Sequence, residues 1–318
     1  MDENKSRNVT QPTLNSQRES LSRQACLEIF HQYKDLLFSI AYRMLGSAAD
    51  AEDMLQETFI RWQQSTQTEI ESPRAFLVTI ISRLCLQHLE SARVKREEYV
   101  GQWLPEPIYT GEHNDPSATS RMQESLSMAF LLMLEKLTPA ERAAFLLHEI
   151  FEYEHCEVAG ILGKSDTACR QLLRRARQRI TSDRPRFETS PAQHQKLLQE
   201  FLAASKTGDL AELVALLSQD VVLYSDGGGK ANAALNPICG RDHVARFLFG
   251  AIQKSVPASV RTRLEEINGQ PSVIYSPADG RAGCVVTFDI ANGVIQNIYV
   301  VTNPEKLRFL PKLPARLL

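Results

Sequence analysis

Three arginines near the middle of the chain have the type and spacing of a nucleic-acid contact surface. Arg170, Arg174 and Arg177 recur at i, i+4 and i+7 and therefore share one face of a predicted helix over 165–177. Residues 161–186 contain eight Lys or Arg and two acids, although the whole chain has a formal net charge of −2. Such a local positive excess is typical of a surface that meets phosphates.

The apolar residues of the same segment predict how this face is positioned. They form a stripe at helical spacing that we expect to be buried: Ala168, Cys169, Leu172, Leu173 and Ala176. A shorter helix is predicted over 153–162, and Gly163 between the two supplies the positive φ of a tight helix–helix turn. The pair is interpreted as a helix-turn-helix whose second helix meets DNA. A solvated basic helix in an ordinary bundle is the alternative interpretation.

Two predicted helices nearer the N-terminus carry groups that suit macromolecular partners. In 50–62, Asp50, Asp53 and Glu57 form an acidic edge that could dock a basic protein, or that simply complements the helix dipole. The helix over 73–98 interleaves polar and basic residues with aromatic residues just beyond its end. This combination suits a separated DNA strand, because aromatic rings stack on unpaired bases and cations follow the phosphates.

Length and composition predict several domains in a cytoplasmic protein. The chain has 318 residues, 43% hydrophobic and 23% charged, and no apolar run approaches the ~18 residues that span a bilayer. Helix caps, proline-rich breaks and strand-like runs divide it as follows: a disordered tail over 1–24, a helical domain over 25–99, a linker over 100–122, a helix-turn-helix domain over 123–184 and an α+β domain over 192–318.

The cysteines and histidines predict no metal site. None of the six cysteines forms a C-x-x-C pair, so they read as reduced, mostly core residues. The candidate ligands His148, His155, Cys156 and Cys169 fit no common zinc spacing. We expect neither a metal nor another cofactor.

Taken together, these segments resemble a known family. The residues 43–59 and 72–77, followed by a linker and the helix-turn-helix, look like the extracytoplasmic-function sigma factors of bacterial RNA polymerase, and the resemblance covers about residues 25–182. Three further stretches resemble the branch of that family with a fused C-terminal SnoaL-like domain: Tyr99–Pro107, Asp226–Lys230 and Asn303–Leu307. The implied fold is two all-α sigma domains, the second a helix-turn-helix, followed by an α+β, SnoaL/NTF2-like, cone-shaped domain.

The resemblance implies two partners, core RNA polymerase and promoter DNA. The acidic-edged helix would bind the polymerase through Asp50, Asp53, Gln56 and Glu57. The helix over 73–98 would open the promoter element nearest the start site through Arg83, Gln87, Arg93, Lys95 and Arg96. The recognition helix would read the upstream element through Ser165, Asp166, Thr167, Arg170, Gln171, Arg174 and Arg177. Arg83 stands where many such factors have asparagine, and Gln87 where an acid is expected, so no promoter sequence is inferred.

The resemblance also implies regulation in cis by the third domain, in place of a separate anti-sigma factor, with the linker threading along the polymerase cleft. The residues concerned are Asp226, Gly227, Gly228, Gly229, Lys230, Asn303, Pro304, Lys306 and Leu307. The glycines predict a loop that acts as a hinge or contact, and an ordinary hairpin turn is the alternative. An unidentified small-molecule or protein signal is expected to act on this domain.

Two other function classes remain as alternatives. A SnoaL-like isomerase fused to a helical module would use Asp226, Asp242, His243 or Asp289 as acid–base groups, although these form no diagnostic spacing. A one-component repressor would use the helix-turn-helix on a palindromic operator and the third domain as a ligand sensor. We expect a non-enzymatic initiation factor.

Overall fold

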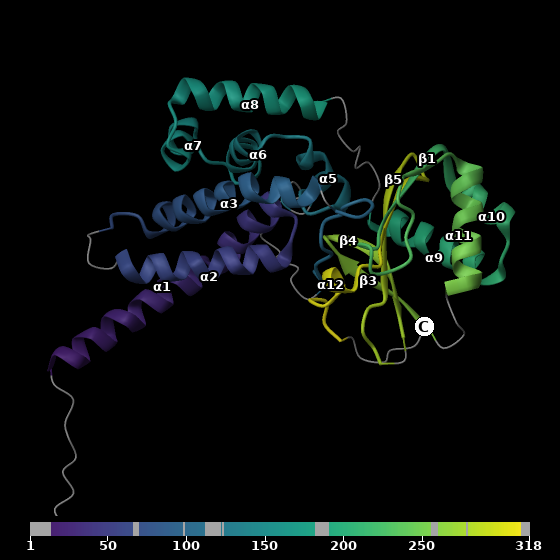
Figure 1. Cartoon of the computed structure of the whole chain (residues 1–318), viewed down its shortest axis with the longest axis horizontal. Helices are drawn as coiled ribbons and strands as arrows, with labels where there is room; N and C mark the ends of the chain where they lie inside the picture. The colour runs from purple at the N-terminus through teal and green to yellow at the C-terminus, as the bar shows by residue number, and fades with distance from the viewer. Residues whose placement is uncertain are drawn as a thin grey trace, which may run out of the picture.

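A computed structural model of the chain describes residues 14–65, 70–97, 99–111, 122, 124–181, 191–255, 260–277 and 279–312, the side chains of 14–23, 92–97, 181, 191 and 252–255 excepted. Figure 1 shows a helical part built from residues before 182 beside a sheet domain built from residues after 190. No helix in the described part of the chain has the length and hydropathy needed to cross a membrane.

Three long helices form the first part: α1 Leu14–Leu45, α2 Ala48–Ser65 and α3 Pro73–Glu97. Gly46 has a φ of 67° and separates α1 from α2, while the Ser47 side chain accepts a hydrogen bond of 3.1 Å from the Asp50 amide at the start of α2. The sequence Ser72-Pro73 predicts an N-cap followed by proline at the first position of α3, and the Ser72 hydroxyl accepts from the Ala75 amide as such a cap requires. Helix α1 includes the last eleven residues of the predicted tail, 14–24, because no glycine or proline interrupts residues 14–45.

The next helices build the helix-turn-helix: α5 Met128–Glu135, α6 Pro139–Phe145, the π-helical turn η1 Leu146–Ile150, α7 His155–Leu162 and α8 Asp166–Thr181. The sequence Thr138-Pro139-Ala140-Glu141 predicts a capping box, and it is present at α6. The predicted positive φ of Gly163 is confirmed at 63°, between α7 and α8. One hydrophobic cluster runs from Cys26 to Ile180, so the two predicted helical domains share a continuous core.

The third part is an α+β domain, as predicted. It contains α9 Pro191–Thr207, α10 Leu210–Ala215, β1 Leu217–Asp226, β2 Ile238–Cys239, α11 Arg241–Ser255, β3 Arg261–Ile267, β4 Gln270–Ser276, β5 Cys284–Ala291, β6 Val294–Val301 and α12 Pro304–Leu307. The strand order is β2-β1-β6-β5-β4-β3, with β1 and β6 parallel and the other neighbours antiparallel. Strand-like runs in the sequence predict strands over 220–224, 272–275, 283–290 and 294–302, and these fall within or overlap β1, β4, β5 and β6.

The sheet is buried on both faces, and each face has a different cover. Successive residues of a strand point to opposite faces, so Ile298 packs with α9, α10 and α11, whereas Tyr299 packs on the other side. The second face is covered by Leu104 of the linker, by Met128 and Ala129 of α5 and by α12. Figure 1 shows α12 on the side of the sheet domain that faces the helical part. The third domain therefore docks on the helical part through one face of its sheet.

Candidate functional site

The predicted DNA-contacting residues of the recognition helix lie at the surface, and they differ in how they are engaged. The side chains of Gln171 and Arg174 are exposed and pair with no described residue. Arg170 forms an i, i+4 ion pair with Asp166 at 3.0 Å. Ser165 caps α8 by accepting a hydrogen bond of 3.2 Å from the Ala168 amide. Thr167 is exposed beside them.

Other arginines of α8 turn back toward the domain. Arg179 reaches the buried Glu141 carboxylate at 2.6 Å, with Arg175 at 3.6 Å from its other oxygen. Arg177, which the sequence places on the DNA face, donates from Nε to Glu149 at 2.9 Å. Of the three predicted arginines, Arg174 alone has no ionic partner among the described residues.

The acidic edge of α2 faces outward as predicted. Asp53 and Gln56 are exposed, and Glu57 pairs with Arg61 at 2.8 Å. Asp50 lies 3.5 Å from Nε2 of His88 on α3. The four predicted polymerase-contacting residues thus form one edge of a helix whose opposite face is fixed by buried Leu55, Thr58 and Trp62.

Arg83 on α3 is engaged with the helix-turn-helix. Its guanidinium donates to the carbonyl of Ile161 at 2.9 Å and to that of Gly160 at 3.1 Å, both at the end of α7. The C-terminal end of a helix attracts a cation because its last carbonyls are unpaired. Gln87 is exposed one turn further on, whereas the side chains of Arg93, Lys95 and Arg96 lie outside the described residues.

Two buried arginines also join the helical domains. Arg43 of α1 donates to the Ser125 hydroxyl at 2.7 Å and to the Met122 carbonyl at 2.8 Å. Arg142 of α6 donates to the Met44 carbonyl at 2.7 Å. Burial lowers the pKa of Arg43 to about 10, so it stays a cation at neutral pH. These contacts and the Arg83 contact hold the helical domains side by side.

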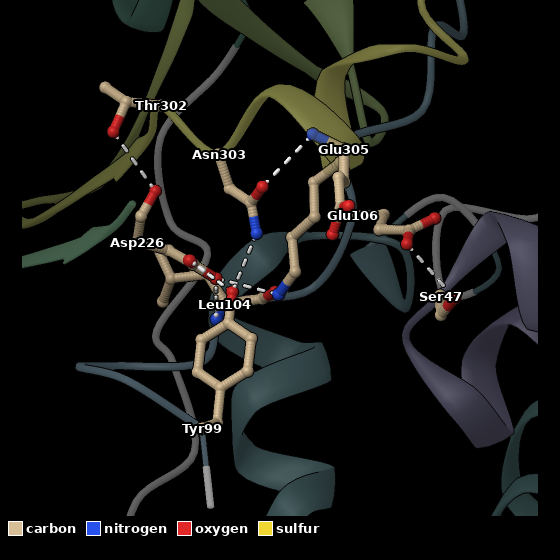
Figure 2. Close-up of polar contacts among 9 residues, drawn as sticks. Ser47, Tyr99, Leu104, Glu106, Asp226, Thr302, Asn303 and Glu305 are labelled. Atoms are coloured by element: carbon tan, nitrogen blue, oxygen red, sulfur yellow. Dashed lines mark hydrogen bonds and ion pairs between the residues drawn. The ribbon is translucent and has the colours of Figure 1, made fainter. Parts of the chain in front are cut away.

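The two motifs predicted to be regulatory meet at a single buried carboxylate. Asp226, at the end of β1, is fully buried and lies 2.7 Å from the ammonium of Lys306 on α12, which is 6% exposed. Its other bonds come from the linker, which in the structure includes Tyr99, one residue earlier than predicted, because α3 ends at Glu97. The Tyr99 hydroxyl donates at 2.6 Å and the Leu104 amide at 2.8 Å. Figure 2 shows Tyr99, Asp226 and Asn303 converging on this point. We call Tyr99, Leu104, Asp226, Asn303 and Lys306 the junction.

Further polar contacts surround the ion pair of the junction. The ammonium of Lys306 also donates to the Leu104 carbonyl and lies 4.3 Å from the centre of the Trp103 ring and 5.0 Å from that of Tyr99. A buried ion pair persists only when further polar contacts compensate the lost hydration, and the contacts named here span the linker and the third domain. Burial, with the bond to Asp226, raises the pKa of Tyr99, which therefore remains a donor.

The glycines of the loop after β1 permit this close approach. Gly228 has a φ of 57°, and a Cβ there would lie 2.3 Å from Nδ2 of Asn303 and 2.9 Å from the Tyr99 hydroxyl. Asn303 donates to that hydroxyl at 2.9 Å and caps α12 by accepting from the Glu305 amide at 3.1 Å. Pro304 follows at the first helical position.

The remaining predicted regulatory residues complete the same contact. Gly227 is equally crowded, because a Cβ there would lie 2.3 Å from the Ala231 carbonyl oxygen. Gly229 packs against Val100, Lys230 pairs with Glu305, and Leu307 is buried on the sheet face that carries the linker. The loop is therefore a contact, which is one of the two roles that the sequence predicts for it.

Further along, the linker joins the third domain to the first helical domain. Glu106 accepts hydrogen bonds from the Ala48 and Ala49 amides at 2.7 and 3.1 Å, so a linker carboxylate caps α2. Its backbone carbonyl accepts from the Tyr42 hydroxyl at 2.6 Å. Asn268, in the turn between β3 and β4, donates to the same hydroxyl at 2.6 Å. Burial raises the pKa of Glu106, and the two amides offset part of that increase.

Several of these residues were not predicted as site residues. Glu106 and Tyr99 lie in the stretch Tyr99–Pro107 that carries the family resemblance, so a signal for them existed. Asn268 precedes Gly269 in an Asn-Gly pair, which is a strong hairpin signal but says nothing of the contact with Tyr42. Arg43 begins the stretch 43–59 that also carries the resemblance, whereas no local pattern marks Arg142. The contacts that join the helical domains through these two arginines span about 80 or more residues of sequence.

The four candidate acid–base groups do not gather at one place. Asp226 lies in the junction, and Asp242 and His243 are exposed at the start of α11. Asp289 is buried, accepts from Asn297 at 2.9 Å and has a raised pKa because of its burial. The domain does contain a cavity of about 330 Å³, and none of these four residues lines it.

Comparison with known proteins covers all three parts of the chain. The family models described as Sigma-70 region 2 and Sigma-70, region 4 match residues 29–94 and 127–180. The ECF RNA polymerase sigma factor SigJ of Mycobacterium tuberculosis is 36% identical over 291 residues, which cover 89% of this chain and 93% of SigJ. A probable ECF RNA polymerase sigma factor of the same species, SigI, is 33% identical over 86% of this chain and 92% of its own length. The crystal structure of M. tuberculosis SigJ superposes with a TM-score of 0.72 at 35% identity, covering 89% of this chain and 99% of that one.

Proposed function

The chain belongs to the extracytoplasmic-function sigma factors of RNA polymerase, and on this premise we propose that its third domain restrains transcription initiation in cis. A promoter-directing sigma factor is the function of the two helical domains. The single observation that carries the regulatory proposal is the junction, where a fully buried Asp226 of the third domain is bound by Tyr99 and Leu104 of the linker.

We infer the binding partners from the membership of the sigma factor family and from the exposed faces of α2, α3 and α8. Core RNA polymerase binds the acidic edge of α2, whose Asp53 and Gln56 are free of the third domain. Promoter DNA is read by α3 near the start site and by α8 upstream, with Arg174 and Gln171 available for base contacts. From these roles we infer a cytoplasmic factor that acts with the polymerase and has no catalytic activity of its own.

The proposed restraint on transcription initiation rests on the contacts that the compact arrangement makes between the helical domains, the linker and the third domain. Two domains that read separate promoter elements must stand apart on DNA, yet α3 and α7 touch through Arg83. The linker that must extend between them is tied to Asp226 at one end and to α2 through Glu106 at the other. Releasing the junction frees the linker, so the open, polymerase-binding conformation becomes more populated. The one-component repressor is not favoured, because both helical domains belong to sigma-70 regions.

The test is run-off transcription with core RNA polymerase on a pool of promoter fragments that includes the region upstream of the protein's own coding sequence. Asp226→Asn removes the charge that Lys306 neutralises, and Asp220→Asn, on the exposed start of the same strand, is the matched control. We expect Asp226→Asn to raise transcript yield roughly 5-fold or more, a typical coupling between sites, with Asp220→Asn at the wild-type level. Equal or lower yield from Asp226→Asn would remove the restraining role and leave the sigma function intact.

A further inference from the structure

A cavity of about 330 Å³ lies on the opposite side of the sheet from the linker, between the sheet and the helices α9 and α11. Apolar side chains make up most of its wall, including Phe201, Phe247 and Val286. Its described lining contains no Asp, Glu, Lys, Arg or His. A site of this size and composition falls in the lower range of small-molecule pockets, and it disfavours a charged occupant because a buried unpaired charge is costly.

The cavity has a polar spot that no residue in the described part of the chain engages. Tyr275 of β4 and Cys284 of β5 are direct cross-strand partners, so both side chains reach the cavity from one place on the sheet. The Tyr275 hydroxyl forms no hydrogen bond with any described residue. Burial raises the pKa of both groups, that of Cys284 to about 12, so both are neutral donors at physiological pH. A hydroxyl donor that no described residue engages favours a ligand that brings an acceptor.

Part of the cavity wall is formed by residues that are adjacent in the chain to residues of the junction. Ser225 and Thr302 line the cavity, and the residues that follow them in the chain, Asp226 and Asn303, belong to the junction. Thr302 further donates to the carbonyl oxygens of Asp226 at 3.2 Å and Asn232 at 3.4 Å, which ties the loop after β1 to the wall. The ends of β1 and β6 thus present one side to the cavity and the other to the linker.

We propose that this cavity binds a small, uncharged, mainly apolar ligand with one hydrogen-bond acceptor aimed at Tyr275, and that its occupancy strengthens the junction. A ligand that contacts Ser225, Thr302 and the 231–233 segment binds only while these are in place, and by linkage it stabilises that arrangement. The second clause rests on the regulatory role proposed above; the binding itself does not.

Prodan, a neutral naphthalene ketone whose fluorescence shifts to the blue in apolar surroundings, is a suitable probe for the full-length protein. We expect saturable binding with a blue shift, and weaker binding of the anionic 8-anilinonaphthalene-1-sulfonate. Ala251→Phe fills the cavity and is expected to lower prodan affinity at least about tenfold. Ala203→Phe, on the exposed side of α9, is the matched control and should bind like the wild type.

Tyr275→Phe keeps the shape of the wall and removes one hydroxyl, so it guards against misfolding of the larger substitution. It should weaken prodan binding roughly 3- to 10-fold, the value of one hydrogen bond. Wild-type affinity in Ala251→Phe, or the absence of saturable binding to the wild type, would overturn the site. Hydrogen exchange of residues 99–111 should slow when prodan saturates the protein. Unchanged exchange would overturn the coupling, and neither readout depends on transcription.

Discussion

Gly228 lies where the loop after β1 touches both the linker and the start of α12. Its positive φ and the space taken by Asn303 and Tyr99 exclude a side chain on two separate grounds. Gly240 offers a comparison within the same domain, because its φ is 88° but nothing lies within 4 Å of a Cβ built there. Comparing substitutions at the two positions therefore distinguishes the effect of backbone strain from the effect of losing the junction contacts.

We therefore predict that Gly228→Ala opens the junction and that Gly240→Ala does not. Both substitutions carry the cost of a positive φ, but the clash adds roughly 1–3 kcal/mol at Gly228 alone. The readout is hydrogen exchange of the Leu104 amide, which donates to Asp226 at 2.8 Å. Faster exchange is expected in Gly228→Ala only. Similar exchange in the two variants would mean that Gly228 does not support the junction.

At the residue scale, sequence could identify the junction motifs but not their pairing. The stretches 226–230 and 303–307 were found through resemblance to a sigma factor branch. Asp226 and Lys306 are 80 residues apart, so no local period connects them. They meet because β1 and β6 pair in parallel, with Asp226 opposite Val301 at the end of the ladder. This strand register is a property of the folded sheet, and the spacing of residues in the sequence does not reveal it.

The recognition helix α8 divides its arginines between DNA and its own domain. Arg174 is exposed without an ionic partner among the described residues, whereas Arg179 is held by Glu141 at 2.6 Å. Arg174→Ala should weaken promoter binding by the holoenzyme by about 1–3 kcal/mol if it reads a base. Arg179→Ala, the control, should leave DNA affinity within about twofold and lower stability instead, since it removes the nearer of two cations from the buried Glu141 carboxylate. Competition binding at fixed salt measures the DNA affinity of both variants. An equal loss of affinity in the two would contradict the assignment of Arg174 to DNA and of Arg179 to its own domain.

Helix α9 contains a histidine that should make the third domain sensitive to acid. Burial lowers the pKa of His194 to about 4, from 6.5 when it is unshielded. Above pH 6.5 the group is neutral in both states, and between pH 6.5 and 4 only the unfolded chain binds the proton. Stability should therefore fall by about 2 kcal/mol between about pH 7.5 and about pH 5.

Urea unfolding of the wild type, His194→Gln and the exposed control His243→Gln checks this expectation. The glutamine at 194 is neutral throughout, so its stability should change less with pH than that of the other two proteins. The same pH dependence in all three would show that His194 is hydrated or already protonated in the folded state.

At the element scale, caps and periodicity predict most helices, and alternation predicts four strands. The prediction missed β3, because Arg261, Arg263, Glu265 and Glu266 break its apolar pattern. It forms nevertheless, since the Asn268–Gly269 turn, with φ values of 54° and 70°, folds it back on β4 in a regular register. Hydrogen bonding to β4 therefore determines that β3 is a strand, although its own residues do not show a strand pattern.

At the scale of the whole molecule, the linker determines how the third domain and the first helical domain are held together. Its prolines and glycines predict only a segment without regular structure, and the resemblance predicts a path along the polymerase. In the free chain, residues 99–111 lie between the third domain and the first helical domain, held at Asp226, Asn268 and Glu106. These contacts join positions more than 50 residues apart, which is why sequence alone did not predict them. The compact state is therefore a competitor of the polymerase-bound one.

The distance between the helix-turn-helix and the third domain tests this competition most directly. Cys156 on α7 and Cys239 on β2 are exposed, whereas Cys26, Cys85 and Cys169 are buried. With nitroxide labels on the two exposed cysteines and Cys284 replaced by serine, pulsed electron resonance reports their separation. We predict one narrow distribution for the free protein, and a broader, longer one for Asp226→Asn and for the complex with core RNA polymerase. The same distribution in all three would contradict a junction that holds the free protein closed.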